Sequence, residues 1–217
     1  MKNQRVAAFG GTFDPVHVGH LTIARKLVEV FELDRFLFLP AYHAPHKPDR
    51  KPTSAFHRFA MLSLATRNDS KIVVSTLELE KHAPRYSVET IPELREMYSD
   101  AKLFFVMGAD SWSDIKTWKE WEQVLTMTNH IVVSRPGYEL KTTHVTDKIR
   151  ERVVDVRGAK LNLNTHERNA DSIYITDAVF FDASATELRE DLSDGKLDNE
   201  DDLPVEVAKY IEKYELY

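Results

Sequence analysis

Two histidines stand three residues apart at the end of a glycine-containing segment near the start of the chain. The segment runs from Gly10 to His20 and reads Gly-Gly-Thr-Phe-Asp-Pro-Val-His-Val-Gly-His. A short apolar run, Val6 to Phe9, precedes it, and apolar residues recur at helical spacing from Leu21 to Phe31. The pattern therefore predicts a strand, a glycine turn and a helix.

Phosphate binding is the chemistry that this arrangement favours. A glycine turn before a helix leaves backbone N–H groups unpaired at the positive end of the helix dipole. His17 and His20 share one face of the first helical turn, where their imidazoles can donate hydrogen bonds to phosphoryl oxygens. A glycine pair or one histidine alone is common in α/β proteins, but their combination with Thr12 and Asp14 is difficult to explain by packing.

Size and composition limit the class of protein. The 217 residues suit one domain, and 42% hydrophobic and 29% charged residues are typical of a soluble globular protein. The absence of cysteine excludes disulfides, thiolate metal sites and cysteine nucleophiles. No apolar run approaches the ~20 residues of a membrane span and no signal peptide is recognisable, so we expect a cytoplasmic protein. The net charge of −6 offers no basic field for nucleic acid.

Strand and helix patterns alternate along the chain. Strands are expected at Val6–Phe9, Arg35–Leu39, Lys71–Ser75, Lys102–Met107, His130–Ser134 and Ser172–Ile175. Helices are expected at Leu21–Phe31, Ser54–Thr66, Ser87–Tyr98, Trp118–Met127, Thr146–Val153, Ser184–Leu192 and Pro204–Tyr214. This order predicts an α/β fold, a doubly wound and mostly parallel sheet with helices on both faces, as a single domain over residues 1–217. Ligands of such sheets bind at the carboxyl ends of the strands.

Two segments that follow expected strands could contact a ligand there. Pro40 to Lys47 is expected as a loop, because its prolines oppose a helix, and Lys47 adds a compact positive charge. Gly108 and Asp110 end the fourth strand pattern, where Asp110 could accept hydrogen bonds from ribose hydroxyls or instead cap a helix. Trp118 and Trp121 predict a packing stripe on one helix, with stacking on a flat ring as the alternative.

Near the end of the chain, Ser184 to Arg189 repeats the pattern of a helix start. The hydroxyls of Ser184 and Thr186 and the backbone N–H groups would face an anion, and Arg189 could add a bidentate contact. Residues 184–217 are therefore expected to form a helical part that completes a nucleotide site. His17, His20, His43 and His46 also permit a transition-metal centre, although two of them would come from a loop.

These segments resemble a known family. His17-Val18-Gly19-His20 is similar to the (T/H)xGH signature of the adenylyltransferase branch of the nucleotidyltransferase superfamily, which has a Rossmann-like fold. The whole chain resembles the bacterial nicotinate mononucleotide adenylyltransferases. The matching segments, in the family's order, are Gly10 to His20, Pro45 to Lys47, Ala83 to Ser87, Gly108 to Ser111, Thr117-Trp118, Ser134 to Gly137, Ser184 to Arg189 and Leu203 to Tyr217.

The resemblance implies an enzyme that joins ATP to nicotinate mononucleotide, giving nicotinate adenine dinucleotide and pyrophosphate in NAD biosynthesis, with Mg²⁺ on the triphosphate. It implies that the catalytic residues are His17, His20, Arg189 and Lys47. The residues that it implies for ATP are Gly10, Gly11, Thr12, Phe13, His17, His20, Gly108, Asp110, Arg135, Ser184, Thr186 and Arg189. Those that it implies for the mononucleotide are Tyr86, Ser87, Asp110 and Trp118, with Trp118 stacked on the pyridine ring.

Some positions and some alternatives stay open at this point. Ala41-Tyr42, Arg85 and Ala183 depart from the residues usual in the family, which affects the expected contacts to the mononucleotide more than the reaction. The acceptor could instead be nicotinamide mononucleotide or another phosphorylated molecule. A metal-dependent hydrolase and a nucleotide sensor without turnover are the alternatives from other classes. The expected partners are small molecules rather than nucleic acid or membrane, and the sequence is compatible with a homo-oligomer.

Overall fold

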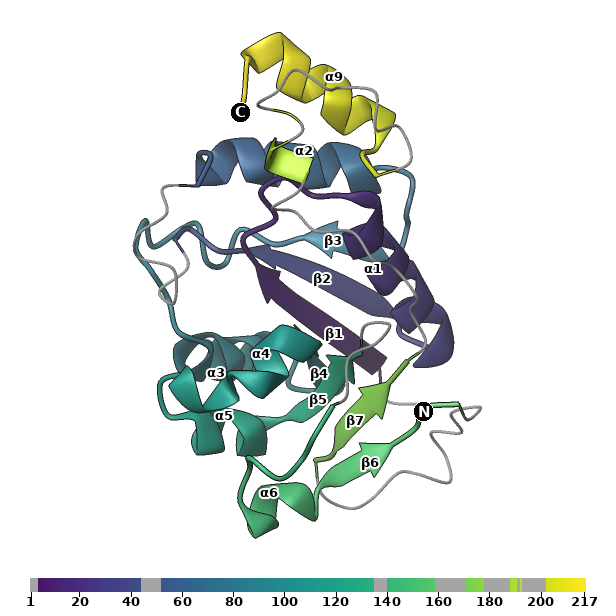
Figure 1. Ribbon diagram of the computed structural model, residues 1–217, viewed down its shortest axis with the longest axis vertical. Coiled ribbons are helices and arrows are strands. Elements are labelled where there is room, and N and C mark those ends of the chain that lie inside the picture. The colour runs from purple at the N-terminus through teal and green to yellow at the C-terminus, as the bar shows by residue number, and fades with distance from the viewer. Residues whose placement is uncertain are drawn as a thin grey trace.

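A parallel β-sheet forms the centre of the molecule. The computed structural model describes residues 4–43, 52–134, 140–158, 171–177, 188–190, 192 and 202–217. Its described strands are β1 (Gln4–Gly11), β2 (Arg35–Pro40), β3 (Ile72–Val74), β4 (Ala101–Gly108), β5 (Asn129–Val133), β6 (Val153–Asp155) and β7 (Ile173–Thr176). These pair in the order β3-β2-β1-β4-β5-β7-β6, and every pair is parallel (Figure 1).

Helices cover both faces of this sheet. The described helices are α1 (Val18–Val30), α2 (Ala55–Thr66), α3 (Ser87–Met97), α4 (Ala109–Ser113), α5 (Trp121–Met127), α6 (Asp147–Arg150) and α9 (Val205–Tyr214), with a 3₁₀ turn at Ile115–Thr117. Buried residues of α1, α2 and α9 belong to one core cluster, and those of α3, α4, α5 and α6 to another. The predicted doubly wound α/β fold is confirmed, and the described sheet is wholly parallel (Figure 1).

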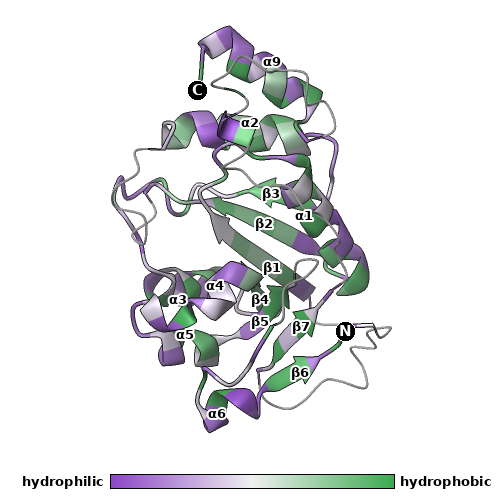
Figure 2. Ribbon diagram, viewed as in Figure 1, coloured by the Kyte–Doolittle hydropathy of each residue, from purple (hydrophilic) through white to green (hydrophobic). Residues whose placement is uncertain are grey.

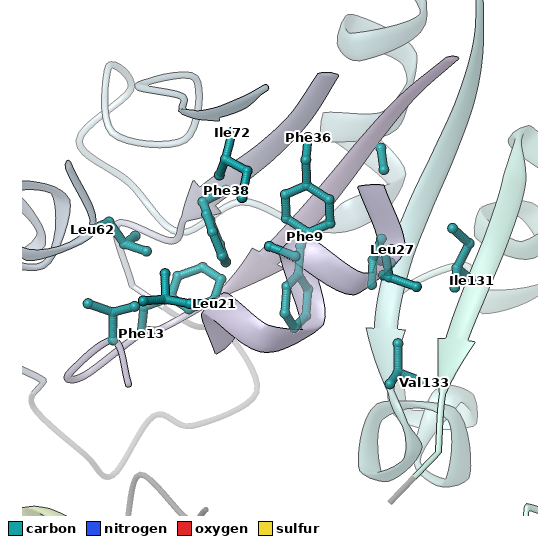
Figure 3. Close-up of a cluster of buried hydrophobic side chains, with 14 of the residues drawn as sticks. Phe9, Phe13, Leu21, Leu27, Phe36, Phe38, Leu62, Ile72, Ile131 and Val133 are labelled. Carbon is teal, nitrogen blue, oxygen red and sulfur yellow. The ribbon is translucent and has the colours of Figure 1, made fainter. Parts of the chain in front are cut away.

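The two cores follow from the alternation of side chains along each buried strand. In β1, Ala7 and Phe9 point into the first cluster, whereas Val6 and Ala8 point into the second. Because both faces are covered, the central part of β1, Val6 to Phe9, is apolar at consecutive positions rather than at every second one (Figure 2). Figure 3 shows the first cluster, in which Phe9 lies among aromatic and aliphatic side chains of β2, α1 and α2.

The order of the strands creates a crevice next to β1. The chain runs outward from β1 to β2 and β3, and then crosses to β4 on the other side of β1. Connections that leave β1 and β4 therefore diverge at the carboxyl ends of these two neighbouring strands. Ligands of doubly wound sheets bind at such a switch point. The glycines Gly10, Gly11 and Gly108 all lie at these strand ends.

Two local predictions require correction, and one short helix was missed. The helix expected at Thr146–Val153 is limited to Asp147–Arg150, because Val153 and Val154 pair with β7 as part of β6. Adjacent β-branched residues favour a strand once a neighbouring strand is available. The helix expected at Trp118–Met127 begins at Trp121, since Trp118 has extended backbone. The short helix α4 was not predicted.

The end of the chain is partly described. Helix α9 begins after Pro204 and ends at Tyr214, as predicted. Residues 188–190 and 192 are helical, in agreement with the helix expected from Ser184, but its expected start lies outside the described residues. Leu188 and Leu192 are buried in the same cluster as Leu21 of α1, so this segment packs on the face that α1 covers.

Candidate active site

The turn between β1 and α1 has a shape that only particular residues can adopt. A Cβ on Gly11 would lie 2.8 Å from the Phe13 ring, so the close approach of this ring requires glycine at position 11. Phe13 has a left-handed backbone with φ of 50°, which is unusual for a bulky residue. Its ring compensates by packing edge-on against Phe9, Phe38 and His20, with centroids 5.6, 5.1 and 5.0 Å away. The turn is therefore supported from the core.

The two histidines lie together at the start of α1. His17 is the N-cap residue, His20 is the third residue of the helix, and their ring centroids are 3.7 Å apart. The backbone N–H of His17 donates to His20 Nδ1 over 3.3 Å, which fixes the direction of the second ring. His17 is 6% exposed, and His20 is half-buried beside Phe13. The spacing thus places both imidazoles on one helical turn.

The backbone at this helix start differs from the expectation of unpaired N–H groups. The N–H of Val18 donates to the carbonyl oxygen of Asp202 over 2.8 Å, and the N–H of His20 donates to that of His17 over 3.0 Å. A segment from the end of the chain thus satisfies one of the groups that local sequence leaves open. Phosphate contacts at this turn would therefore depend more on side chains than the sequence alone indicates.

A cavity of about 640 Å³ opens at the switch point between β1 and β4. Its size suits a small-molecule ligand. The lining residues come from the ends of β1, β2 and β4 and from the segments near α3 and α4: Gly10, Gly11, Thr12, Ala41, Glu78, Arg85, Ser87, Phe105, Asp110, Ser111, Asp114, Thr117 and Trp118. A second cavity, of about 470 Å³, lies at the opposite ends of β4 and β5, and no predicted site residue lines it.

One side of the large cavity is formed by the start of α3 and the residues after α4. Tyr86 is the N-cap of α3, and its N–H donates to the Glu89 carboxylate over 3.2 Å. Lys119 Nζ lies 4.8 Å from the centroid of the Tyr86 ring, in a cation–π contact. Trp118 packs edge-on against Phe105, with centroids 6.5 Å apart, and is half-buried. Part of its surface therefore stays accessible for a ligand in the cavity.

Glu78 and Arg85 add opposite charges to this side. The Thr90 hydroxyl donates to Glu78 over 2.9 Å, and burial raises the pKa of Glu78 above its usual value. Arg85 donates to the carboxylate of Glu93 over 2.6 Å and to the main-chain oxygen of Glu89 over 3.2 Å. These contacts fix the Arg85 guanidinium at the start of α3. Arg85 is one of the positions that depart from the family pattern, and it lines the cavity.

The cavity brings together some of the predicted site residues. Those that line it are Gly10, Gly11, Thr12, Ser87, Asp110 and Trp118. Phe13 and Tyr86 are chain neighbours of the lining residues Thr12 and Ser87, and Gly108 lies two residues before Asp110. His17 and His20, at the start of α1, do not line the cavity. Arg189 reaches the same turn, because its Nη1 donates to the main-chain oxygen of Asp14 over 2.5 Å. The predicted residues Lys47, Arg135, Ser184 and Thr186 lie outside the described parts of the chain, as does His46.

Sequence reasoning missed several residues that support the cavity. Arg58 of α2 is fully buried and contacts the segments that follow β1 and β2. The sequence does indicate that Arg58 is buried, because it belongs to the helical stripe that also contains Ala55, Met61 and Leu62. A charged residue at such a position needs partners in the interior. Glu78 and Phe105 gave no comparable signal.

Two absences hold for the described part of the chain. There, no three His, Asp or Glu side chains are grouped so as to hold a metal ion. Nor is any helix in that part both long enough and apolar enough to span a bilayer.

Comparison with known proteins gives consistent results. The cytidylyltransferase-like family matches residues 8–191. A probable nicotinate-nucleotide adenylyltransferase of Thermoanaerobacter sp. (strain X514) is 36% identical over 214 residues, which cover 98% of this chain and 94% of the relative. A protein of the same name from Mycolicibacterium smegmatis is 38% identical over 142 residues, 65% of this chain and 67% of the relative.

A solved structure shares the fold. Plasmodium falciparum nicotinic acid mononucleotide adenylyltransferase, complexed with NaAD, superimposes with a TM-score of 0.71 at 18% identity, covering 99% of this chain and 97% of that one. At this identity the likeness establishes the fold, whereas the Thermoanaerobacter relative establishes the kinship over nearly the whole chain. The chain therefore belongs to the cytidylyltransferase-like family and, within it, groups with the nicotinate-nucleotide adenylyltransferases.

Proposed function

We propose that this protein is a nicotinate-nucleotide adenylyltransferase, which transfers the adenylyl group of ATP to nicotinate mononucleotide and releases pyrophosphate. The observation that carries the proposal is the single cavity at the β1–β4 switch point. The glycine turn of β1 lines one side of it, and Ser87, Asp110 and Trp118 line the other. The family resemblance implies the first group for ATP and the second for the mononucleotide, with Asp110 implied for both, and the relatives are named for this activity.

The proposed reaction is an in-line displacement at phosphorus. An oxygen of the 5′-phosphate of nicotinate mononucleotide forms a bond to the α-phosphorus of ATP, and the bond from that phosphorus to pyrophosphate breaks. The attacking phosphate already carries negative charge at neutral pH, so the step needs no general base. Catalysis then depends on aligning the two phosphates and on stabilising charge on the transferred and leaving oxygens.

On the ATP side, the proposal assigns hydrogen bonds to phosphate oxygens to His17 and His20. Their placement on one turn, with centroids 3.7 Å apart, suits two donors that contact neighbouring oxygens of one triphosphate. Arg189 and Lys47 add positive charge, and Gly10, Gly11 and Thr12 let the backbone approach the nucleotide closely. Mg²⁺ enters this proposal with ATP, since Mg²⁺ is commonly bound through substrate phosphates and few protein carboxylates.

On the mononucleotide side, the proposal assigns the pyridine ring to Trp118. Its half-buried ring is held edge-on by Phe105, which leaves a flat surface for stacking. Asp110 would accept hydrogen bonds from ribose hydroxyls. Ser87, as the first residue of α3, would present a helix N-terminus to the carboxylate of nicotinate. A cytoplasmic location would give the enzyme direct access to ATP.

The test is to incubate the purified protein with ATP, Mg²⁺ and nicotinate mononucleotide and to identify the product by mass. Nicotinate adenine dinucleotide and an equal amount of pyrophosphate are expected. Nicotinamide mononucleotide, supplied in a parallel reaction, measures the preference for the acid. The His20→Ala variant, purified in the same way, controls for contaminating enzymes. A strong preference for the amide, or no product with either acceptor, would contradict the proposal.

A further inference from the structure

Asp14 lies in the turn between β1 and α1 and is contacted from distant parts of the chain. Its carboxylate accepts a hydrogen bond from the N–H of Thr53 over 3.4 Å and one from the Tyr217 hydroxyl over 2.5 Å. Its main-chain oxygen accepts from Arg189. Asp14 is 5% exposed and stands three residues before His17. These contacts tie the turn that carries the histidines to three other segments.

Arg58 supports the same turn from beneath. Its side chain is fully buried and donates to the carbonyl oxygens of Thr12, Thr53 and Ala41 over 2.6, 2.8 and 2.7 Å. The guanidinium is planar with donors in fixed directions, so these bonds set the spacing between the segments after β1 and β2. Thr12 and Ala41 both line the cavity. The backbone near Asp14 is thus fixed on one side by Arg58.

The segment that contains α9 contacts the other side of the turn between β1 and α1. The carbonyl oxygen of Asp202 accepts a hydrogen bond from the N–H of Val18, the first residue of α1. The Tyr217 hydroxyl donates a hydrogen bond to the carboxylate of Asp14, which precedes α1. Between them, Val207 and Ile211 of α9 are buried in the core cluster that also contains α1 and α2 residues. Burial, followed by the hydrogen bond to Asp14, raises the pKa of Tyr217, so the hydroxyl stays protonated and acts as donor.

We propose that Tyr217 is a positioning residue for the phosphate-binding turn, acting through its hydrogen bond to Asp14. Neither Tyr217 nor its hydrogen-bond partner Asp14 is among the residues that line the cavity, so its effect on turnover would pass through the position of the turn. The two residues are 203 positions apart in the sequence, and their contact joins the end of the C-terminal segment to the turn before His17. The effect on turnover rests on the proposed adenylyl transfer, whereas the effect on ATP binding does not.

The test is Tyr217→Phe, which removes one oxygen and keeps the ring. Misplacement of reacting groups by about 1 Å can cost on the order of 100-fold in rate, so a smaller shift of the turn is expected to lower kcat about tenfold. The KM for nicotinate mononucleotide should change less than twofold, because the acceptor side of the cavity is untouched. Tyr214→Phe is the matched control, since Tyr214 lies on α9 and is 48% exposed. It should leave kcat unchanged.

A second pair of measurements separates positioning from stability. All variants are compared at a temperature well below their melting transitions, and the affinity for a non-reactive methylene analogue of ATP is measured by calorimetry. Asp14→Ala removes the acceptor of the same hydrogen bond, together with the longer bond from the Thr53 N–H, and serves if Tyr217→Phe does not fold. In the double variant the two losses of kcat should not multiply, because both break one interaction.

The outcomes distinguish this proposal from the proposed function. A lower melting temperature for Tyr217→Phe with unchanged kcat and unchanged analogue affinity would show a purely structural role and overturn the proposal. If the wild type makes no dinucleotide, but Tyr217→Phe weakens analogue binding severalfold and Tyr214→Phe does not, positioning stands and the assigned reaction fails. If the wild type neither binds the analogue nor turns over, both are overturned.

Discussion

The two sides of the cavity are built differently. On the side of the glycine turn, Phe13, Asp14, His17 and Arg58 are all buried, and their contacts reach α2, residue 189 and the segment of α9. On the opposite side, Ser87 and Trp118 are half-buried and Asp110 is exposed. This second side carries the exposed ion pair between Lys119 and Glu89, beside the buried hydrogen bond from Thr90 to Glu78.

The difference corresponds to what each side would have to do. The turn would face the triphosphate, where charge develops during the reaction, and fixed donors are most effective there because they need no rearrangement. The other side would bind the acceptor ring and ribose, for which contact area matters more than exact direction. We therefore expect substitutions in the turn and beneath it to have larger effects than those on the acceptor side.

The largest effect is expected for His20→Ala. The imidazole would be lost as a hydrogen-bond donor to the triphosphate, and loss of one such donor typically lowers turnover by about 100-fold to 1,000-fold. Its ring contacts with Phe13 and His17 lie at the half-buried edge of the turn, so the protein should still fold. Turnover near that of the wild type, with unchanged circular dichroism, would refute the role given to His20.

Arg58→Met should cause the largest loss of stability. The substitution keeps an apolar stem but leaves buried carbonyl oxygens, including those of Thr12 and Ala41, without their donor. The free energy of unfolding, measured in urea, should fall by about 3 kcal/mol or more. Arg67→Met, at the C-cap of the same helix, is the control, because its exposed ion pair with Glu206 should contribute little. Equal losses for the two variants would contradict the importance of the buried guanidinium.

Acid should lower the free energy of unfolding, and His130 of β5 should account for part of this loss. This residue is fully buried beside Phe105, and burial lowers its pKa from 6.5 to about 3. The folded state therefore holds the neutral ring, while the unfolded chain takes up a proton below pH 6.5. The stability due to His130 is full above pH 6.5 and is lost as the pH falls toward 3, by up to about 1.4 kcal/mol per pH unit.

Comparison of the wild type with His130→Gln isolates this contribution. The variant should lose the corresponding part of the pH dependence when unfolding in urea is measured from pH 7.5 to 5, whereas other titrating groups affect both proteins alike. Parallel curves for the two proteins would show that His130 does not carry the dependence.

Trp118→Ala should affect the acceptor more than ATP. Loss of stacking on one flat ring typically costs about 1–3 kcal/mol, so the KM for nicotinate mononucleotide should rise roughly tenfold or more. The KM for ATP should stay within twofold of the wild-type value, because Trp118 lies on the other side of the cavity from the glycine turn. A parallel increase in both constants would indicate a general disturbance of the cavity instead.

The smallest effect is expected for Lys119→Gln. Lys119 is exposed, although it contacts the Glu89 carboxylate over 3.0 Å and the Tyr86 ring. Solvent screens such pairs, so the urea midpoint should not move measurably. A shift comparable with that of Arg58→Met would remove the contrast between the two sides.

Much of the fold was predictable because it is encoded locally. The apolar runs of β1, β2, β4 and β5 are continuous, and the intervening helical periods are clear, so the parallel sheet and its covered faces followed from the sequence. The histidine pair was predictable for the same reason, since three-residue spacing places two side chains on one helical turn. Strand β6 could not be predicted in this way, because Val153 adopts strand structure only through its pairing with β7.

The support of the site required the tertiary structure. Arg58 could be suspected from its place in an apolar stripe, but its carbonyl partners lie in segments that the helical period does not specify. Likewise, no local pattern links Tyr217 to Asp14 or Asp202 to Val18. The sequence by itself determined the β1–turn–α1 unit and the chemistry of its side chains, because both depend on residues a few positions apart. Only the packing of distant segments decided how that unit is held, since such contacts form when separate helices meet on one face of the sheet.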